Sequence, residues 1–227
     1  MEAPRARSRD ILVGAVVLGS VWGLVEVVLG GAMKSASIPY KGDLLTGLGI
    51  GIMAVAVALF RRSLPLLGIA VVAVALKQLA VPILHLPLMC KANSCLAVGL
   101  AGTALAGTSA LAGRRLDRGI LPRVATGASA ALAGAVGFYF IGMQVAPCKY
   151  LLSFNHPGGF VAFLGAEGLI WTALGGLCFP AGYRLGLGLR SGLLDLPVRR
   201  PVIYYTASAA ITALAWVAGG LAIAAGL

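Results

Sequence analysis

Seven long apolar stretches constrain this chain more than any other feature of its sequence. Each is close to the length of about 20 residues that an α-helix needs to cross the hydrocarbon core of a membrane. Backbone polar groups inside a membrane must be hydrogen-bonded within the protein, and the alternating pattern of a β-barrel is absent. The sequence therefore predicts an all-α, polytopic transmembrane helical bundle of about seven helices, with six as the alternative. The stretches are residues 11–32, 44–60, 65–89, 96–113, 120–146, 160–183 and 202–226.

The composition supports the same class of protein. Only 11% of the 227 residues are charged and 59% are hydrophobic, whereas a soluble domain carries about 25% charged residues. No remaining segment is long enough for a second domain, so residues 1–227 are expected to form a single integral membrane domain. The net charge of +11 is confined to short clusters between apolar stretches, without a basic face interleaved with aromatic residues. Nucleic acid is therefore not an expected partner.

Arginines mark one side of the predicted bundle. They occupy the N-terminus and every second connection after it, whereas Lys34, Lys41, Lys91 and Lys149 occupy the other connections. The positive-inside rule then places the N-terminus in the cytoplasm and the C-terminus outside, in the cytoplasmic (inner) membrane of a prokaryote. The first stretch is expected to be a retained helix rather than a cleaved signal peptide, because it is long and contains Trp22 and Glu26.

A short sequence in the first stretch recurs in altered form in the sixth. Residues 22–31 and 167–176 share Gly, Leu, Leu, Gly and Gly, with the Trp and Glu positions exchanged. Chance similarity in a chain rich in Gly, Ala and Leu is the alternative explanation. Glu26 and Glu167 are the only acidic residues inside the predicted apolar stretches, and a carboxylate at membrane depth indicates a functional site. Because the two helices run in opposite directions, each Glu is expected about one turn, 5.4 Å, outside a Trp.

The third stretch carries the remaining polar side chains at this depth, together with Pro82 and Pro87. We expect an outward-facing pocket with aromatic walls that binds a small solute. The alternative is a buried Glu–Lys pair that fixes helix packing and binds nothing. One Lys cannot neutralise two Glu, which favours an added proton, cation or basic ligand. The predicted substrate-binding residues are Trp22, Glu26, Lys77, Gln78, His85, Glu167 and Trp171.

Two connections have their own expected roles. The first external connection contains Pro39, Tyr40 and Lys41, and forms either a gating lid over the pocket or an ordered turn with an interfacial tyrosine. Cytoplasmic residues 184–200 alternate Leu with Gly and basic residues. This stretch is expected to lie on the anionic inner leaflet, with docking to a partner as the alternative.

Three cysteines fall on the predicted outer side, where disulfides are permitted. Cys90 and Cys95 bracket one connection and Cys148 lies in the next. A disulfide that joins two loops is the preferred interpretation, and Cys178 is expected to be inert packing. The alternative is an iron–sulfur cluster, haem or zinc held with His85 or His156, although the spacing is not typical of zinc sites. Otherwise no cofactor is expected.

In its layout the chain resembles the substrate-binding (S) components of energy-coupling-factor importers, over residues 11–183. The small residues Ala15, Gly19 and Gly23 match the ridge of the family's first helix, and residues 37–42 match its first external loop. The resemblance implies that the ridge meets a membrane-coupling subunit, that the loop closes over a vitamin or metal-ion site, and that ATPase subunits drive release. The seventh helix and the external cysteines depart from the family's pattern.

The sequence therefore predicts a membrane-embedded, substrate-binding subunit of a small-molecule importer, with the lipid bilayer, the solute and other membrane and ATPase subunits as partners. No nucleotide-binding loop, catalytic triad or metalloprotease motif is present, so an enzyme is not expected. One alternative is a membrane subunit of a redox complex that uses Cys90, Cys95 and Cys148. Another is a non-catalytic membrane anchor of a larger complex.

Overall fold

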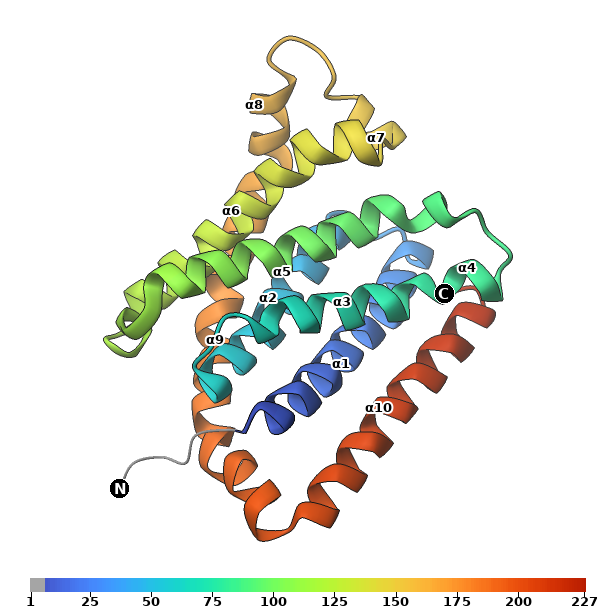
Figure 1. The fold of residues 1–227 in the computed structure, drawn as a ribbon. Helices are drawn as coiled ribbons and strands as arrows, with labels where there is room; N and C mark the ends of the chain where they lie inside the picture. Colours follow the sequence, from blue (N-terminus) through green and yellow to red (C-terminus); the bar gives the residue numbers. More distant parts are fainter. Residues whose placement is uncertain (1–6) are drawn as a thin grey trace.

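A computed structural model describes residues 7–227, except for the side chains of Leu88 and Cys90 (Figure 1). Helices make up its regular structure, and seven helical segments are long and apolar enough to span a membrane. The prediction of an all-α, multi-pass membrane protein is thereby confirmed. The elements are α1 Ser8–Ser35, α2 Lys41–Phe60, α3 Pro65–Gln78, α4 Ala80–Ile83, η1 Leu88–Lys91, α5 Ala92–Ala112, η2 Gly113–Asp117, α6 Ile120–Val145, α7 Lys149–Leu152, α8 Gly159–Phe163, η3 Leu164–Gly168, α9 Leu169–Arg199 and α10 Pro201–Ala224.

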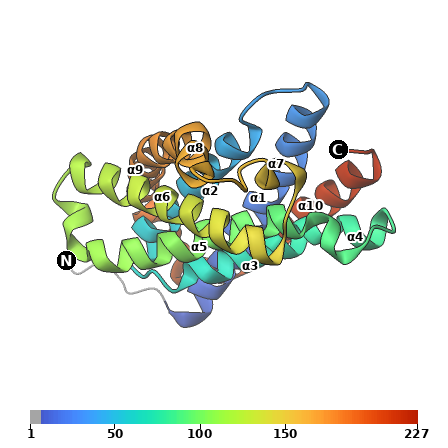
Figure 2. The same ribbon diagram turned by 90° about the horizontal axis from the view of Figure 1, so that it is seen from above.

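Helix α2 lies at the centre of the bundle and is the most buried of the spanning segments. It packs against α9 on one side and α1 on the other, while α6 covers α9 and α3 covers α1 (Figures 1 and 2). Close approach between α2 and α9 depends on glycine: a Cβ atom at Gly186 would lie 2.7 Å from the Val55 carbonyl oxygen. Small residues at helix contacts permit such packing in membranes.

Proline divides the third span into two helices. Helix α3 ends at Gln78 and α4 begins at Ala80. Pro82 has no N–H to donate, and its ring clashes with the carbonyl group four residues earlier, which belongs to Gln78. The chain therefore breaks at Leu79, and residues 84–87 continue without regular structure to η1.

The sixth span is much longer than the sequence indicated. Residues 159–199 form 41 residues of nearly continuous helix, about 60 Å against a hydrocarbon core of about 30 Å. The expected end at residue 183 is therefore corrected, because residues 184–199 are the last turns of α9. The position of residues 184–200 on the inner leaflet stays a prediction. The helix continues because Tyr183 and Gly186 are still packed against neighbouring elements, on Asp117 and α2 respectively.

The seventh helix, α10, covers the outer face of α1. The Trp216 indole N–H donates to Ser20 Oγ at 3.0 Å, and the Tyr205 hydroxyl group donates to Asp10 Oδ1 at 2.8 Å. At the far end of the contact the backbone of Leu227 lies against Gly31. Contacts along the whole of α1 thus hold the last helix of the chain against the first.

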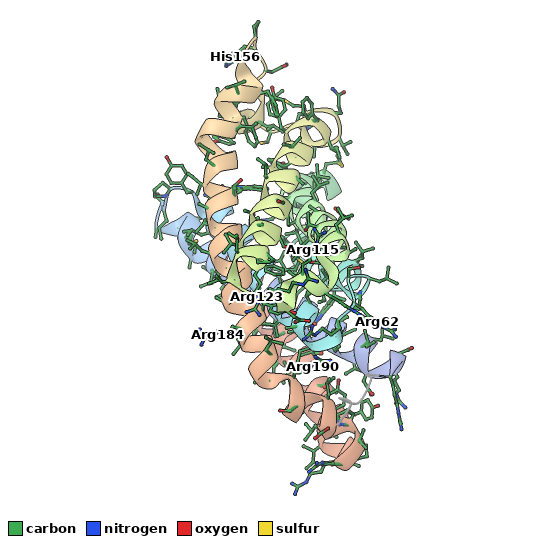
Figure 3. All side chains as sticks on the ribbon, turned by 90° about the vertical axis from the view of Figure 1, so that its left-hand side faces the viewer. Arg62, Arg115, Arg123, His156, Arg184 and Arg190 are labelled. Atoms are coloured by element: carbon green, nitrogen blue, oxygen red, sulfur yellow. The ribbon has the colours of Figure 1, made fainter. Side chains whose placement is uncertain are left out.

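The two ends of the bundle differ in charge. We call the end that holds the α2–α3, α5–α6 and α9–α10 connections the arginine end, and the opposite end the lysine end (Figure 1). Arg62 and Arg190 lie toward the arginine end, whereas His156 lies at the tip of the α7–α8 connection at the lysine end (Figure 3).

Candidate functional site

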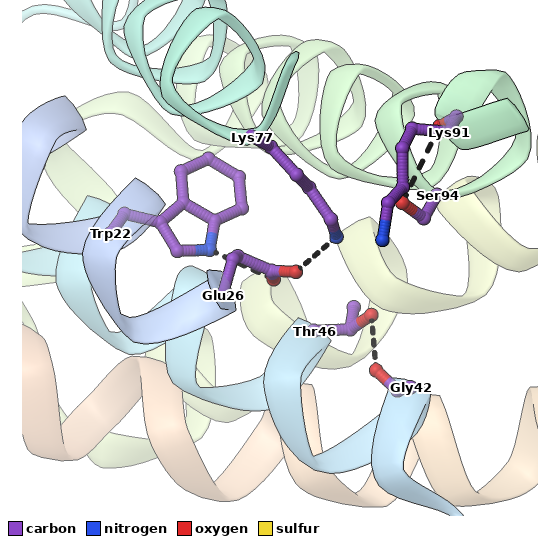
Figure 4. Close-up of polar contacts among 7 residues, drawn as sticks. All are labelled: Trp22, Glu26, Gly42, Thr46, Lys77, Lys91 and Ser94. Atoms are coloured by element: carbon purple, nitrogen blue, oxygen red, sulfur yellow. Dashed lines mark hydrogen bonds and ion pairs between the residues drawn. The ribbon is translucent and has the colours of Figure 1, made fainter. Parts of the chain in front are cut away.

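Glu26 is neutralised inside the chain. It is 5% exposed, and its Oε2 accepts a hydrogen bond from Lys77 Nζ on α3 at 2.6 Å. Its Oε1 accepts from the indole N–H of Trp22, one turn earlier on α1, at 3.3 Å (Figure 4). Trp22, Glu26 and Lys77 thus meet as predicted from their depth, and they form the buried Glu–Lys pair that the sequence left as an alternative.

Glu167 and Trp171 do not repeat this arrangement. The Trp171 indole N–H donates to Asp43 Oδ1 on α2, and Glu167 Oε1 accepts from the Tyr150 hydroxyl group. Glu167 lies in η3, a π-helical turn at the start of the long α9 segment. Such turns insert one extra residue into a helix and are frequent at functional sites. Here the π-helical turn contains Glu167, whose side chain accepts the hydrogen bond from Tyr150.

Asp43 is a central residue of the site that the sequence interpretation missed. It is 0% exposed, and its Oδ2 is buried without a hydrogen-bond donor. Its carboxyl group lies near enough to the Glu167 carboxyl group for the two charges to act on each other. Within residues 7–227, neither residue takes part in an ion pair. We call Asp43 and Glu167 the acidic pair.

Two neighbouring carboxyl groups that are both ionised repel each other unless a positive charge lies with them. They form a direct hydrogen bond only when they share a proton; otherwise a cation must bind between or beside them. Tyr150 supports Glu167 from the other side. Burial and the hydrogen bond to Glu167 raise the pKa of the Tyr150 phenol above its ordinary value of 10.0, so this side chain remains a neutral donor.

Aromatic rings form one wall beside the acidic pair. The Trp171 ring packs against Phe138 with centroids 5.8 Å apart, and Phe138 packs in turn against Phe163. Tyr139 extends this cluster and donates from its hydroxyl group to the Phe154 carbonyl oxygen at 3.1 Å. The wall combines apolar surface with ring faces that attract cations.

Helix α2 joins the two halves of the site. The Trp22 indole packs directly on Gly49, where no Cβ atom fits, and Asp43 lies six residues earlier, about 9 Å along the helix axis. Glu26 lies about 6 Å beyond Trp22 in the same direction, because α1 and α2 run antiparallel. Glu26 and Asp43 are therefore at similar depth in the lysine half, and Thr46 lies about one turn further along α2 than Asp43. Lys91 also points toward Glu26 and Thr46 (Figure 4).

The other predicted binding residues are less closely joined to this cluster. Gln78, at the end of α3, has a buried Oε1 without a donor. His85 is exposed, in the irregular segment after α4, with a positive φ of 51°. The predicted lid residues Pro39, Tyr40 and Lys41 are exposed, and Tyr40 lies close enough to Tyr150 to act on it electrostatically. The first external connection leads directly into the first turn of α2, which carries Asp43.

The small-residue ridge of α1 faces another helix of the same chain. A Cβ atom at Gly19 would lie 2.7 Å from Val72 Cβ, and one at Gly23 would lie 2.9 Å from Leu76 Cβ. Ala15 is buried at the same contact. The ridge is filled by α3, so the prediction that Ala15, Gly19 and Gly23 meet a partner subunit finds no free surface there.

The described cysteines are free thiols, which corrects the expected disulfide for Cys95 and Cys148. Cys148 Sγ instead accepts hydrogen bonds from Asn93 Nδ2 at 2.8 Å and from the Leu151 backbone N–H, and so caps α7. Cys95 is buried on α5. The Cys90 side chain is not among the side chains that the structure describes.

A metal or haem centre gains no support from the described residues. Among them, no group of three His, Cys, Asp or Glu side chains is close enough together to hold a metal ion. The segment after α4 that carries His85 lies apart from the α7–α8 connection that carries His156, both in Figure 1 and in Figure 2.

Comparison with known proteins gives no relative. No protein-family model, no curated protein and no solved structure matches the chain. Any functional assignment must therefore come from the geometry and chemistry of the site.

Proposed function

We propose that this multi-pass membrane protein is the substrate-binding subunit of an importer, and that it captures a small cationic solute at the lysine end. The observation that carries the proposal is the acidic pair. Asp43 is fully buried, one of its oxygens has no donor, and Glu167 lies beside it without a basic partner within residues 7–227. Buried carboxylates are otherwise paired or hydrogen-bonded.

The balance of charge favours a cation as the ligand. Three carboxylates, from Glu26, Asp43 and Glu167, are set against two ammonium groups, from Lys77 and Lys91, which leaves one negative charge. Glu26 is already paired with Lys77, so the unbalanced charge rests on the acidic pair. An ammonium group bound there would donate to Asp43 Oδ2 and Glu167, while the Trp171 indole N–H holds Asp43 Oδ1 in place.

The surroundings supply the other parts of a binding site. The Phe138 and Trp171 rings exclude water from one side of the acidic pair. The first external connection leads directly into the first turn of α2, which carries Asp43, and its residues Ser37 and Tyr40 have positive φ values of 53° and 55°. Non-glycine residues in this conformation are strained and cluster at clamps and switches. In this proposal the connection acts as the lid of the binding site. The protein lies in a prokaryotic inner membrane with its arginine end in the cytoplasm.

Release into the cell would need energy from other subunits, as the resemblance to energy-coupling-factor importers implies. The α1 ridge is filled by α3 and the outer face of α1 by α10. The proposal therefore does not place the coupling subunit on α1.

Native mass spectrometry of gently purified protein tests this function. The wild type should carry a small molecule that Asp43→Asn and Glu167→Gln variants lose, and that Asp195→Asn retains. Asp195 is a matched control because it is an acidic residue in an exposed ion pair on the same helical segment as Glu167. Calorimetric titration with ethanolamine and choline then distinguishes primary from quaternary ammonium groups. A ligand that survives both site substitutions would overturn the proposal, as would the absence of any binding by the wild type.

A further inference from the structure

A large cavity lies at the arginine end, away from the acidic pair. Its volume is about 1050 Å³, and its lining comes from the ends of α2 and α5, from η2 and from the extended part of α9. Ligand pockets occupy about 300–1,000 Å³, so this cavity is large enough for a small molecule or a lipid headgroup. The extension of α9 beyond the expected membrane boundary forms one of its sides.

The lining of this cavity is strongly basic. Five guanidinium groups contribute to it, from Arg61, Arg62, Arg114, Arg118 and Arg190, and its one acidic residue is Asp117. Asp117 forms an ion pair with Arg61. Within residues 7–227, the other four arginines have no ion-pair partner. The cavity thus has an excess of four positive charges.

Two polar groups in the lining lack partners although they are buried. Ser109 is 5% exposed, and its hydroxyl group makes no hydrogen bond. The Nε–H group of Arg190 is buried and has no acceptor. Both residues line the cavity. Native proteins leave few such groups unsatisfied, and each one calls for an explanation such as a bound ligand or ion.

The wall around these groups is held in place by its own contacts. The Tyr183 hydroxyl group donates to Asp117 Oδ1 at 2.9 Å, and Arg123 lies over the Tyr183 ring at 4.7 Å from its centroid. Arg123 Nε also donates to the Leu116 carbonyl oxygen at 2.8 Å. These contacts fix η2 and α6 against α9 and so preorganise the cavity.

We propose that this cavity binds a phosphate-bearing anion. Guanidinium groups present paired N–H donors that match phosphate oxygens, and several of them suit a group with more than one negative charge. The Ser109 hydroxyl group and Arg190 Nε–H would donate to the same anion. Arginines that only set topology extend into solvent or lipid headgroups, as Arg184 does where it points away from the bundle (Figure 3). The phosphate belongs either to an anionic lipid headgroup or to a soluble metabolite.

The site is separate from the proposed solute site and does not depend on it. The acidic pair lies on the lysine-end halves of α2 and the α9 segment, whereas the cavity lies at the opposite end of α2, where Val57 lines it. Loss of anion binding should therefore leave solute binding at Asp43 unchanged.

Binding measured on the full chain in dodecyl maltoside, a detergent without phosphate, tests the proposal. Pyrophosphate is the soluble probe, measured by calorimetry, and phosphatidylglycerol is the lipid probe, measured by native mass spectrometry. Wild type and Arg184→Met should bind one of the two probes, while Arg190→Met and Arg118→Met should bind it at least about 10-fold more weakly. Ser109→Ala, the mildest change, should weaken it less. Affinity should fall as salt is raised.

The two probes separate the two sources of phosphate. Binding of pyrophosphate alone identifies a soluble ligand, and retention of phosphatidylglycerol alone identifies a lipid headgroup. If Arg190→Met does not fold, Arg118→Met and Ser109→Ala carry the comparison. The proposal is overturned if the wild type binds neither probe, or if Arg184→Met loses as much affinity as the cavity variants.

Discussion

The Trp171 indole N–H donates to Asp43, a residue 128 positions earlier on another helix, and not to Glu167 one turn before it. In the related stretch of α1, Trp22 donates to Glu26 on its own helix. In the two stretches, where Trp and Glu have exchanged places, the tryptophans therefore have different kinds of partner. Trp22 donates to a Glu on its own helix, and Trp171 donates to an Asp on α2. One carboxylate is neutralised by Lys77, while the other two form the acidic pair.

Asp43→Asn should stabilise the ligand-free protein while abolishing cation binding. The amide group removes a buried charge and gives Glu167 a hydrogen-bond donor, worth about 1 kcal/mol. The thermal midpoint in detergent, followed by tryptophan fluorescence, should rise relative to wild type. Asp195→Asn should leave the midpoint unchanged. A purely structural role for Asp43 predicts a lower midpoint instead.

Lys77→Met should be among the most destabilising single substitutions. It leaves the Glu26 carboxylate buried without its cation, and breaking a buried ion pair costs about 3–5 kcal/mol. The double variant Glu26→Gln with Lys77→Met should recover most of this loss, because no charge is then left buried. Arg199→Met, in an exposed pair with Asp195, should cost less than about 1 kcal/mol. Equal losses in the single and double variants would contradict the pairing.

Gly186→Ala and Gly188→Ala test the packing of α9 on α2 as a matched pair. A Cβ atom at Gly186 would meet Ala58 Cβ at 2.7 Å, whereas one at Gly188 meets nothing within 4 Å. Overpacking should cost the first variant about 1–3 kcal/mol. The second should gain up to about 1 kcal/mol, because Ala is the better helix former. Thermal unfolding of both variants in one detergent gives the comparison.

Thiol labelling should find Cys95 and Cys148 reduced, with different reactivity. In a Cys90→Ser background, the half-buried Cys148 should react with a maleimide before the buried Cys95 does. Asn93→Ala should speed labelling of Cys148 by removing the amide that covers its sulfur. Peptide mass mapping assigns each adduct, and an unreactive Cys95–Cys148 disulfide would contradict the structure.

Reporter fusions should place the arginine end in the cytoplasm. Alkaline phosphatase fused after Leu227 should be active in a bacterial host, while the same enzyme fused after Arg118 should be inactive. Green fluorescent protein at the same two positions should give the opposite pattern. The expectation follows from the positive-inside rule, since the α5–α6 connection carries three arginines. An inverted pattern would reverse the direction of the proposed import.

The apolar stretches predicted the helices well because membrane spans are defined by hydrophobicity over many residues. The ends of the helices were harder to predict than the helices themselves. Helix α2 starts at Lys41 instead of residue 44, and those three residues decide whether Asp43 is seen as a loop residue or as a buried carboxylate. An acidic residue in the first turn of a helix is favoured by the helix dipole, and this signal was present in Lys41-Gly42-Asp43.

The contacts of the site were predictable only in part. Equal depth correctly brought Trp22, Glu26 and Lys77 together, because residues at matching heights on the neighbouring helices α1 and α3 can meet. Depth does not say which faces of two helices turn toward each other, so it did not show that Trp171 would turn toward α2. Likewise, Gly186 and Gly188 in the extended part of α9 look alike in sequence, and only packing distinguishes them.

The contact between α1 and α10 joins two helices far apart in the sequence, so it forms only after most of this chain has been made. Asp10 and Ser20 enter the membrane early in synthesis, long before Tyr205 and Trp216 have left the ribosome. Until then, their side chains lack the hydroxyl and indole partners that α10 supplies. A nascent chain that stops before residue 201 leaves this face of α1 uncovered. Synthesis of α10 is therefore the step that covers this face of α1.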